Sequence, residues 1–460
     1  MDNRYDIIVI GSGPGGYVAA IRAAQCGKRV AIVEKADAGG VCLNWGCIPT
    51  KALVRSAQVY ADCKAAATYG VAIEGEVKPD WTKMVERERM VATTMNKGVQ
   101  FLLKKNNIDV IAGFGRLKAS DTVEVEGADY EADHIILATG ARPRVMPFMP
   151  VDGKHIISSK EALVLPELPE SMVVVGSGAI GSEFAYIYAT LGVKVTIIEY
   201  MPQIMPLEDE DTAKAMERAF RKLRATVMTS TTVKKVTVND EGKCVIDIEG
   251  KKGEQTIEAD IVLSAVGIKS NIEDMGLEEL GIEIERDKIK VDEHFKTSVD
   301  GVYAIGDIIT TPALAHVAST EAIHCVEHIC GLNPEAIDYT TIPSCIFTSP
   351  EVASVGMTEA QVKAAGIEYK VGKFPYTASG KATAAGERDG HVKLIFDNEE
   401  KLLGAHFVGH NVTEMIGEPT LAKVLGVNAH RIARTIHAHP SMHEAVMEAA
   451  EDALGCAIHM

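Results

Sequence analysis

Two cysteines close together in the chain, Cys42 and Cys47, are the residues best placed to do redox chemistry. They lie in the segment GGVCLNWGCIPTKAL, residues 39–53, whose glycines and Pro49 are typical of a loop rather than of a packed core. Pro49 is well placed in the first turn of a helix formed by the residues that follow, TKALVRSAQVYADCK. Cys47 would then face a helix N-terminus, which lowers the pKa of a thiol and favours the thiolate. The pattern therefore favours a reversible disulfide.

Two other interpretations of the pair are weaker. Cysteines are often small buried hydrophobic residues, but a glycine-rich loop is a poor place for one. A zinc half-site needs a second close pair of ligands, and the other close pair, Cys325 and Cys330, falls within a helical pattern. The chain has nine cysteines, an odd number, and a chain of 460 residues does not need a disulfide framework to fold. We therefore predict a catalytic pair and no metal site.

An internal repeat could position such a pair. The runs IIVIGSGPGG, residues 7–16, and VVVGSGAIGS, residues 173–182, are each an apolar strand that turns through glycines into a helical pattern. Each copy continues to a second apolar strand that ends in an acid, Glu34 or Glu199, at the same distance from the first glycine. The glycines with the G-x-G-x-x-G spacing are Gly11, Gly13 and Gly16 in the first copy and Gly176, Gly178 and Gly181 in the second.

This motif binds the pyrophosphate of a dinucleotide. The first glycine permits a tight turn, the second lets the backbone approach the pyrophosphate, and the third lets the helix pack on the strand. The anion sits at the helix N-terminus, and the acid accepts hydrogen bonds from the adenosine ribose. Two copies with the same arrangement predict two dinucleotide sites. Glu199 is followed by Tyr200 and Met201, with no arginine nearby, which favours NAD over NADP in the second site.

The first copy is the longer one. The two copies of the repeat end in similar strand patterns. These are EADHIILATGA, which starts at Glu131, and EADIVLSAVGI, which starts at Glu258. Because the two acids lie at equal distances, the extra residues of the first copy follow Glu34, where the cysteine pair is found. The pair is therefore expected beside the first dinucleotide, and electron transfer between two dinucleotides is indicated.

Length and composition limit the possible classes of protein. The chain has 460 residues, 47% of them hydrophobic, which suggests several domains. Its formal net charge of −17 argues against a nucleic-acid or anionic-membrane partner. The N-terminal sequence MDNRYDIIVIGSGPGG lacks the apolar core of a signal peptide, and no segment is expected to span a membrane, so we predict a cytoplasmic protein. Beyond residue 341, TIPSCIFTSPEVASVG and VKLIFDNEEKLLGAHFVG are typical of strands.

The cysteine segment, both glycine motifs, AIGD at residues 304–307 and HAHPSMHE at residues 437–444 together resemble the pyridine nucleotide-disulfide oxidoreductase family, and within it the enzymes that oxidise dihydrolipoamide. The resemblance covers essentially the whole chain. It implies an α/β fold with two Rossmann-like dinucleotide-binding domains and a C-terminal α+β dimerisation domain. The implied domains are an FAD-binding domain of residues 1–145 and 271–340, an NAD-binding domain of residues 146–270 and a dimer interface domain of residues 341–460.

The resemblance also implies roles for single residues. Cys42 would exchange with the substrate, and Cys47 would lie next to the flavin. Lys51 would lie near the flavin and pair with Glu183. The residues expected to bind FAD or NAD are Gly11, Gly13, Gly16, Glu34, Lys51, Thr139, Gly140, Gly176, Gly178, Gly181, Glu199, Gly267, Asp307 and Ala315.

The histidine-rich segment near the C-terminus supplies the expected base. By the resemblance, His439 and Glu444 are a base and its orienting carboxylate, delivered to the disulfide of the other subunit of a homodimer. Thiol–disulfide exchange requires a thiolate, and histidine titrates in the right pH range to form one. The cluster of His437, His439 and His443 could also be ligands of a metal, but Pro440 and Glu444 fit the base-and-carboxylate element instead.

The implied reaction is the oxidation of dihydrolipoamide with reduction of NAD, through FAD and the disulfide. The dihydrolipoamide would be carried by a lipoyl domain of a 2-oxoacid dehydrogenase complex or of the glycine cleavage system. Two alternatives stay open: another NAD(P)H-dependent disulfide or mercuric reductase, for which the single Cys456 is a poor match, and a non-enzymatic flavin protein that senses NADH. Four residues depart from the usual family pattern without removing a catalytic group: Val41, Ile268, Ser270 and Ser441.

Overall fold

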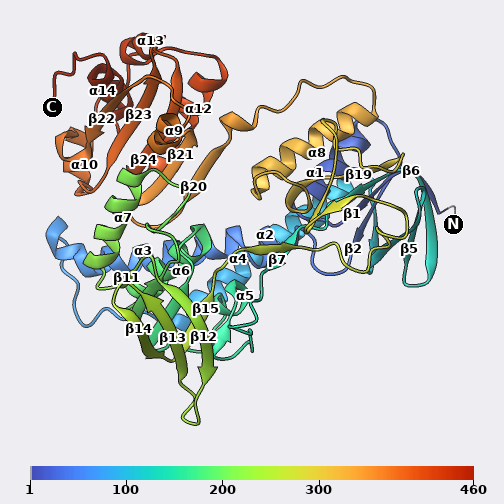
Figure 1. Ribbon diagram of the computed structural model, residues 1–460, viewed down its shortest axis with the longest axis horizontal. Coiled ribbons are helices and arrows are strands. Elements are labelled where there is room, and N and C mark those ends of the chain that lie inside the picture. The colour runs from blue at the N-terminus through green and yellow to red at the C-terminus, as the bar shows by residue number, and fades with distance from the viewer. Residues whose placement is uncertain (1–2) are drawn as a thin grey trace. The chain divides into compact units, whose positions relative to one another are not determined.

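The computed structural model describes residues 3–460, and the chain divides into two compact units (Figure 1). The first unit comprises the residues up to 53, 82–144 and 267–337. The second comprises residues 54–81, 145–266 and 338–460. The helix α3 (Cys47–Ala65) contributes residues to both units. The three-domain division expected from the sequence stays a prediction.

The first unit is built on a seven-stranded sheet with the order β3-β2-β1-β6-β5-β4, in which β19 also pairs with β6. The strands are β1 (Arg4–Ile10), β2 (Val30–Glu34), β3 (Asp109–Ala112), β4 (Gly115–Ala119), β5 (Thr122–Val125), β6 (Ala128–Leu137) and β19 (Val302–Ala304). Strands β1, β2, β3, β6 and β19 pair in parallel, while β4 and β5 are antiparallel. The centre of β1 is a continuous apolar run because Ile7, Ile8 and Val9 are all fully buried.

Two helices of the first unit, α1 (Pro14–Gln25) and α8 (Ala315–Ile329), lie side by side (Figure 1). Small residues such as Gly15 and Ala19 permit this close packing, since a Cβ atom at Gly15 would press on Ala318. The remaining elements are α2 (Gly40–Asn44), α4 (Trp81–Lys105), the pair β7 (Ala141–Pro143) and β16 (Ile268–Ser270), the pair β17 (Ile284–Glu285) and β18 (Lys288–Ile289), and the 3₁₀ turn η2 (Gly306–Ile308).

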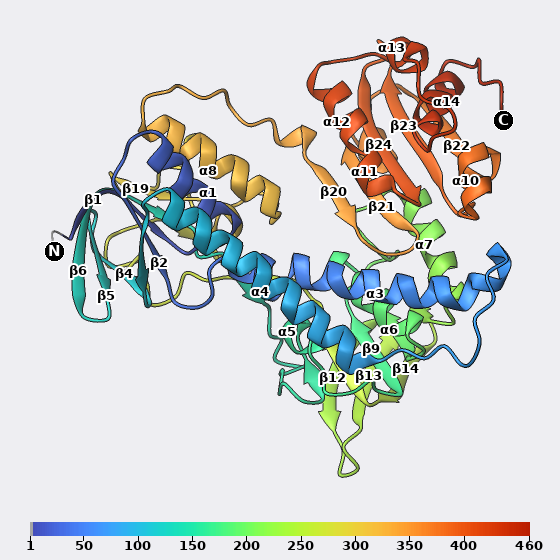
Figure 2. The same ribbon diagram turned by 180° about the vertical axis from the view of Figure 1, so that it is seen from behind.

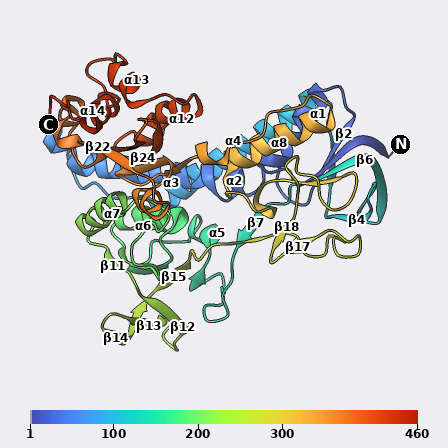
Figure 3. The same ribbon diagram turned by 45° about the horizontal axis from the view of Figure 1, so that its top comes forward.

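The second unit contains a second parallel sheet with the order β11-β10-β9-β15-β8. Its strands are β8 (Ile156–Ile157), β9 (Ser171–Val175), β10 (Lys194–Ile198), β11 (Thr226–Met228) and β15 (Ile261–Ser264). The associated helices are α5 (Ser159–Ala162), α6 (Ala179–Thr190) and α7 (Glu210–Lys222). An antiparallel meander of β12 (Thr232–Val238), β13 (Cys244–Gly250) and β14 (Gly253–Ala259) projects from this sheet, as Figure 3 shows.

The C-terminal part of the second unit is an antiparallel sheet with the order β20-β21-β24-β23-β22, flanked by short helices (Figure 2). The strands are β20 (Pro343–Ile346), β21 (Glu351–Gly356), β22 (Tyr369–Pro375), β23 (His391–Asp397) and β24 (Leu402–Gly409). The helices are α9 (Glu359–Ala364), α10 (Gly380–Ala385), α11 (Val412–Met415), α12 (Gly417–Val424), α13 (Ala429–Arg434) and α14 (Glu444–Ala453), and the 3₁₀ turns are η3 (Tyr339–Thr341) and η4 (Tyr376–Ala378). The 3₁₀ turn η1 (Ala66–Tyr69) follows α3 much earlier in the chain. A mostly parallel α/β sheet, a fully parallel one and this α+β region confirm the predicted fold class.

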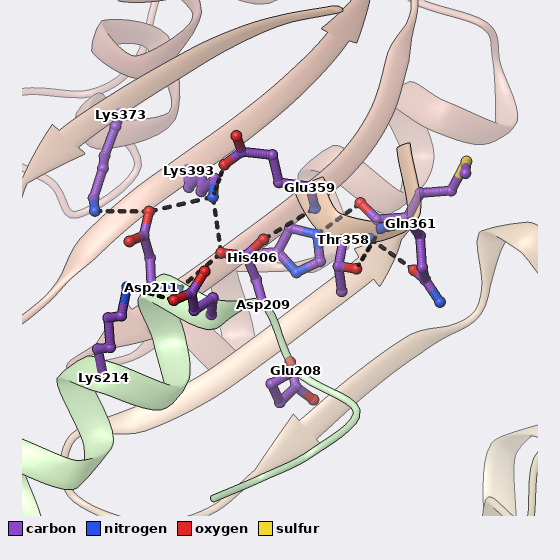
Figure 4. Close-up of polar contacts among 12 residues, drawn as sticks. Glu208, Asp209, Asp211, Lys214, Thr358, Glu359, Gln361, Lys373, Lys393 and His406 are labelled. Carbon is purple, nitrogen blue, oxygen red and sulfur yellow. Dashed lines mark hydrogen bonds and ion pairs between the residues drawn. The ribbon is translucent and has the colours of Figure 1, made fainter. Parts of the chain in front are cut away.

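A buried ionic cluster joins α7 to the antiparallel sheet (Figure 4). The ammonium of Lys393 on β23, only 2% exposed, lies 2.8 Å from Asp209, 2.7 Å from Glu359 and 3.2 Å from Asp211. Asp209 also caps α7 and accepts a hydrogen bond from the backbone N–H of Glu359 at 3.0 Å. Burial alone would lower the pKa of Lys393, but its carboxylate partners raise it above the ordinary value. One buried cation therefore fixes the start of α7 within the second unit.

Within residues 3–460, no helix has the length and apolar character needed to cross a membrane.

Candidate functional site

The two cysteines lie on α2 and at the start of α3. Cys42 is in the middle of α2, and Cys47 is the first residue of α3. The chain enters α2 through Gly39 and Gly40, whose φ angles are 94° and 60°. A side chain at Gly40 would collide with the backbone of Gly13. The cysteine segment therefore lies directly against the first glycine motif, which is where the sequence places it.

The two sulfur atoms are in hydrogen-bond contact with one another as thiols. This contact with Cys47, together with burial, raises the pKa of Cys42 well above that of an ordinary thiol, and the positive charge of Lys51 opposes the rise. Sulfur atoms in contact are what a reversible disulfide requires.

In the first glycine motif, several hydrogen-bond donors hold the carboxylate of Glu34. The backbone N–H and the hydroxyl of Ser12 donate to Glu34 Oε2 at 2.9 and 2.6 Å, and the Ala36 N–H donates to Oε1 at 2.8 Å. The backbone fills the space beside Gly16, because a Cβ atom there would overlap the carbonyl oxygen of Gly11. A carboxylate can accept about four hydrogen bonds, so Glu34 retains capacity for a ribose hydroxyl.

The N-terminus of α1 is open to an anion. Its N-cap, Gly13, offers no side chain to the first-turn N–H groups, and the first turn contains no acid. A cavity of about 580 Å³ lies beside Ser12 and Glu34. Its polar lining also includes Gln100, Lys104, Asn107 and Asp109. The open helix end and the cavity fit the pyrophosphate and adenosine of FAD. No sequence motif marks the four polar residues, and the sequence analysis missed them.

The second glycine motif holds its acid with the same pair of hydrogen bonds from a serine. The N–H and the hydroxyl of Ser177 donate to Glu199 Oε2 at 2.9 and 2.6 Å. A Cβ atom at Gly181 would overlap the carbonyl oxygen of Gly176. Helix α6 follows Gly178, again without a side-chain cap or an acid in its first turn. This end of α6 fits the pyrophosphate of NAD.

Thr139 and Gly140, at the end of β6, are held by Asn271. The Thr139 hydroxyl donates to Asn271 O at 2.6 Å, and the Asn271 side-chain amide donates to Thr139 O at 3.0 Å. The Asn271 N–H donates to Gly140 O at 2.9 Å. Gly267, with a φ of 103°, makes the turn before β16. No motif in the sequence marks Asn271, because its partner Thr139 lies 132 residues away in the chain.

The turn η2 carries Asp307. Burial raises the pKa of its carboxyl group, and Lys288 opposes the rise. The Gly306 N–H donates at 2.7 Å to Glu321, a fully buried carboxylate on α8, the helix that begins at Ala315. Glu321 thereby fixes the turn that carries Asp307, and the sequence analysis missed this residue too.

His439 and Glu444 are brought together in the second unit. His439 Nδ1 lies 2.8 Å from Glu444 Oε1, and the Ser441 N–H donates to Glu444 Oε2 at 2.8 Å. Burial raises the pKa of the Glu444 carboxyl, but these two bonds outweigh it, so the pKa is lowered overall. The side chain of His439 is 78% exposed. The arrangement is an exposed imidazole oriented by an ionised carboxylate, which suits a base acting on a substrate from outside.

A second carboxylate holds the two histidines on either side of His439. Glu418 Oε1 lies 2.7 Å from His437 Nε2, and Oε2 lies 2.8 Å from His443 Nδ1. The bond to Glu418 raises the pKa of His437. No spacing in the sequence points to Glu418, which stands on α12. Among residues 3–460, no cluster of three or more His, Cys, Asp or Glu side chains is arranged to hold a metal.

Lys51 and Glu183 belong to different units, and their pairing stays a prediction. Lys51 acts on Cys42 within the first unit. Glu183, on α6 and almost fully buried, accepts a hydrogen bond from the Phe347 N–H at 2.9 Å within the second. The cysteine pair and the pair of His439 and Glu444 likewise belong to different units.

Known proteins resemble the chain over its whole length. The profile of the family "pyridine nucleotide-disulphide oxidoreductase" matches residues 5–322, and that of the family's dimerisation domain matches residues 342–450. The dihydrolipoyl dehydrogenase of Chlorobaculum parvum is 47% identical over 98% of this chain and 97% of its own. That of Bacillus subtilis is 44% identical over the full length of both chains.

Two solved structures share the fold. LpdA from Mycobacterium tuberculosis has a TM-score of 0.90 and 27% identity, covering 97% of this chain and 99% of its own. The HOCl-induced flavoprotein disulfide reductase RclA from Escherichia coli has a TM-score of 0.88 and 26% identity over the same shares. These similarities confirm the resemblance inferred from the motifs. The chain belongs to the pyridine nucleotide-disulphide oxidoreductase family.

Proposed function

We propose that this chain oxidises a dihydrolipoyl group to its disulfide and reduces NAD to NADH, with FAD and the pair of Cys42 and Cys47 between them. The observation that carries the proposal is the contact between the two sulfur atoms, on a segment fixed against the first glycine motif. The substrate class is supported by relatives named dihydrolipoyl dehydrogenase that align with the whole chain.

The cofactors fit the residues present. The first motif offers an open helix end, a cavity and the acceptor Glu34 for FAD, and the second offers Glu199 and the end of α6 for NAD. Bound FAD would accept an electron pair from the reduced cysteines and pass it to NAD. Asp307, Thr139 and the residues around them would complete the FAD site.

The proposal includes the following sulfur chemistry. His439 of the partner subunit takes a proton from one thiol of the substrate, and the resulting thiolate attacks Cys42 Sγ. The bond between Cys42 and Cys47 breaks, and its electron pair stays on Cys47 as a thiolate. The second substrate thiol then attacks the substrate sulfur of the mixed disulfide, which closes the cyclic disulfide and releases Cys42, and the proton of that second thiol passes to the Cys42 sulfur. The substrate has lost two electrons, and the cysteine pair has gained them.

Two charged groups support this exchange. Lys51 lies within electrostatic range of the pair and favours the negative sulfur. Glu444 holds the imidazole of His439 in one orientation. Because the base is expected from the other subunit, activity should require a homodimer, in line with the match to the family's dimerisation domain.

The proposal also covers the bounds of the domains and the carrier of the substrate. The FAD-binding domain is residues 1–145 and 271–340, the NAD-binding domain 146–270 and the interface domain 341–460. The substrate is carried on a lipoyl domain of a 2-oxoacid dehydrogenase complex or of the glycine cleavage system. Cytoplasmic location stays a prediction.

A comparison of substrates tests the proposal. The purified protein, reconstituted with FAD, is assayed for NADH formation from dihydrolipoamide and NAD, and separately for NADPH-driven reduction of glutathione disulfide and of Hg²⁺. We expect dihydrolipoamide to be the best substrate, with NAD preferred over NADP. Faster reduction of Hg²⁺ or of glutathione disulfide would assign the chain to another branch of the family. If the protein binds FAD and NADH but turns over none of these three substrates, the alternative of a non-enzymatic flavin protein that senses NADH is favoured.

A further inference from the structure

A second pair of cysteines meets in the first unit, far from the glycine-motif ends of the helices that carry it. Cys26 ends α1, and Cys330 ends α8. The thiol of Cys26 lies close enough to that of Cys330 to help raise its pKa. Both side chains are partly exposed and pack on the edge of the same hydrophobic core.

An ion pair keeps the two helix ends together. Arg22 in the last turn of α1 donates to Glu327 near the end of α8, with distances of 3.0 and 2.5 Å from its two donor nitrogens. Since α1 and α8 pack along their lengths, the contact between Cys26 and Cys330 is supported by the helices themselves. Two thiols held near one another by packed helices are candidates for a disulfide.

We propose that Cys26 and Cys330 form a second, structural disulfide that a hydroperoxide can close and a dithiol can open. The thiolate of one cysteine attacks the peroxide, which gives a sulfenic acid and releases hydroxide or an alkoxide. The thiol of the other cysteine displaces water from that sulfenic acid. Overall, two thiols lose two electrons and two protons, and hydrogen peroxide is reduced to two molecules of water.

The surroundings make this pair slower to react than the catalytic one. Cys330 lies at a helix C-terminus, where the helix dipole disfavours a thiolate, whereas Cys47 lies at a helix N-terminus. Burial and the contact with Cys26 raise the pKa of Cys330 to about 11, and the nearby Lys28 opposes the rise. A slow, long-lived disulfide that does not take part in turnover is therefore expected.

The bond would tie together the two helices that frame the FAD site. The N-terminus of α1 faces the expected pyrophosphate, and α8 holds the turn of Asp307 through Glu321. A link at the opposite ends of these helices leaves the cofactor contacts unchanged while it restrains the first unit. It also closes a very long loop of the unfolded chain, which is the case in which a disulfide stabilises most.

The test uses the FAD-loaded enzyme treated with hydrogen peroxide. Remaining thiols are alkylated, and the protein is digested without reduction and examined by mass spectrometry. We expect a cross-linked peptide that contains Cys26 and Cys330, formed more slowly than the bond between Cys42 and Cys47 and reversed by dithiothreitol. The temperature of FAD release should rise by about 5 °C when the bond is closed.

Two variants test the pairing, and a third is the control. C26S and C330S should lose both the cross-link and the temperature shift while they keep NAD reduction at the parent rate, and C63S, which changes a cysteine outside both pairs, should keep the cross-link and the shift. The proposal is overturned if Cys26 and Cys330 remain open to alkylation after the catalytic pair has been oxidised, or if each is oxidised separately to a sulfinic acid. A cross-link that persists in the C26S protein would also refute the pairing.

Discussion

The two glycine motifs are nearly identical in detail, and the segments that follow them are not. Each motif holds its acid with the same two bonds from a serine, at 2.9 and 2.6 Å in both copies. After Glu34 the chain forms the cysteine segment and α4, beside the cavity. After Glu199 it forms an acidic segment that ends at the buried cluster around Lys393. The shared part recognises a dinucleotide, and the differing part determines what each site does with it.

The largest effect is expected from removing the feature that only the first copy has. Replacing Cys47 with Ser deletes the sulfur that faces the helix N-terminus, so NAD reduction by dihydrolipoamide should fall by about 10⁴-fold or more. Reduction of an artificial dye by NADH, which does not need the disulfide, should continue. Steady-state assays with the two electron donors measure both, and a variant that still oxidises dihydrolipoamide at a tenth of the parent rate would contradict the role of Cys47.

The matched substitutions Gly16→Ala and Gly181→Ala test the part that the copies share. Each new Cβ atom would overlap a backbone carbonyl oxygen, and such overpacking costs about 1–3 kcal/mol. We expect G16A to retain FAD poorly and G181A to bind FAD normally but NAD about 10- to 100-fold more weakly. Absorbance of the purified protein and titration with NAD measure the two effects.

A control for these variants is Gly98→Ala on α4, where nothing lies within 4 Å of the added atom. G98A should bind both cofactors as the parent does. Loss of FAD in G181A, or of NAD alone in G16A, would reverse the assignment of the two sites.

Variants of Glu418 extend the comparison to the base in the second unit. Glu418→Ala releases His437 and His443 and should lower kcat/KM for dihydrolipoamide about 10-fold, because His439 is then less well placed. Glu418→Gln can keep both bonds without the charge, so it should retain most of the rate. Equal losses in the two variants would show that charge, not position, is what matters.

The free energy of unfolding should also depend on pH in a way that the variant E418Q tests. Glu418 raises the pKa of His437, and this contribution is complete below pH 6.5 and is lost as the pH rises through the folded-state pKa. The pKa of Glu418 is lowered overall although burial opposes this, so its own contribution is lost as the pH falls below 4.5. The free energy of unfolding should therefore differ most between the parent and E418Q from pH 4.5 to 6.5. Urea unfolding at a series of pH values measures the difference.

The smallest effect is expected at Glu208, in the segment that only the second copy has. Burial raises the pKa of this carboxyl to about 7. A raised acid pKa stabilises the fold only while the group is protonated, so stability falls as the pH rises from 4.5 through 7. Glu208→Gln should unfold like the parent at pH 5 and be about 2 kcal/mol more stable at pH 8. If the difference in unfolding free energy between E208Q and the parent is constant from pH 5 to pH 8, the raised pKa of Glu208 is contradicted.

The sequence predicted the parts of the site that depend on local spacing. The glycines, the acids and the cysteine pair each lie within one turn or one strand–helix unit, so their positions follow from motif spacing. Asn271 acts on a residue 132 positions away, and Glu418 and Glu321 act across 19 and 15 positions, so none of the three belongs to a local motif that the sequence could reveal. The buried Lys393 had one local signal: it is a lysine inside the apolar run of β23.

The central claim is that the pair of Cys42 and Cys47 carries electrons from a dithiol to the flavin. The most direct test is an anaerobic titration of the FAD-loaded protein with dihydrolipoamide, followed by addition of NAD. We expect a long-wavelength absorbance band from a thiolate in contact with the flavin, and then NADH. If dihydrolipoamide leaves the flavin spectrum unchanged while NADH reduces it, both dinucleotide sites are present but the claim about the disulfide is wrong.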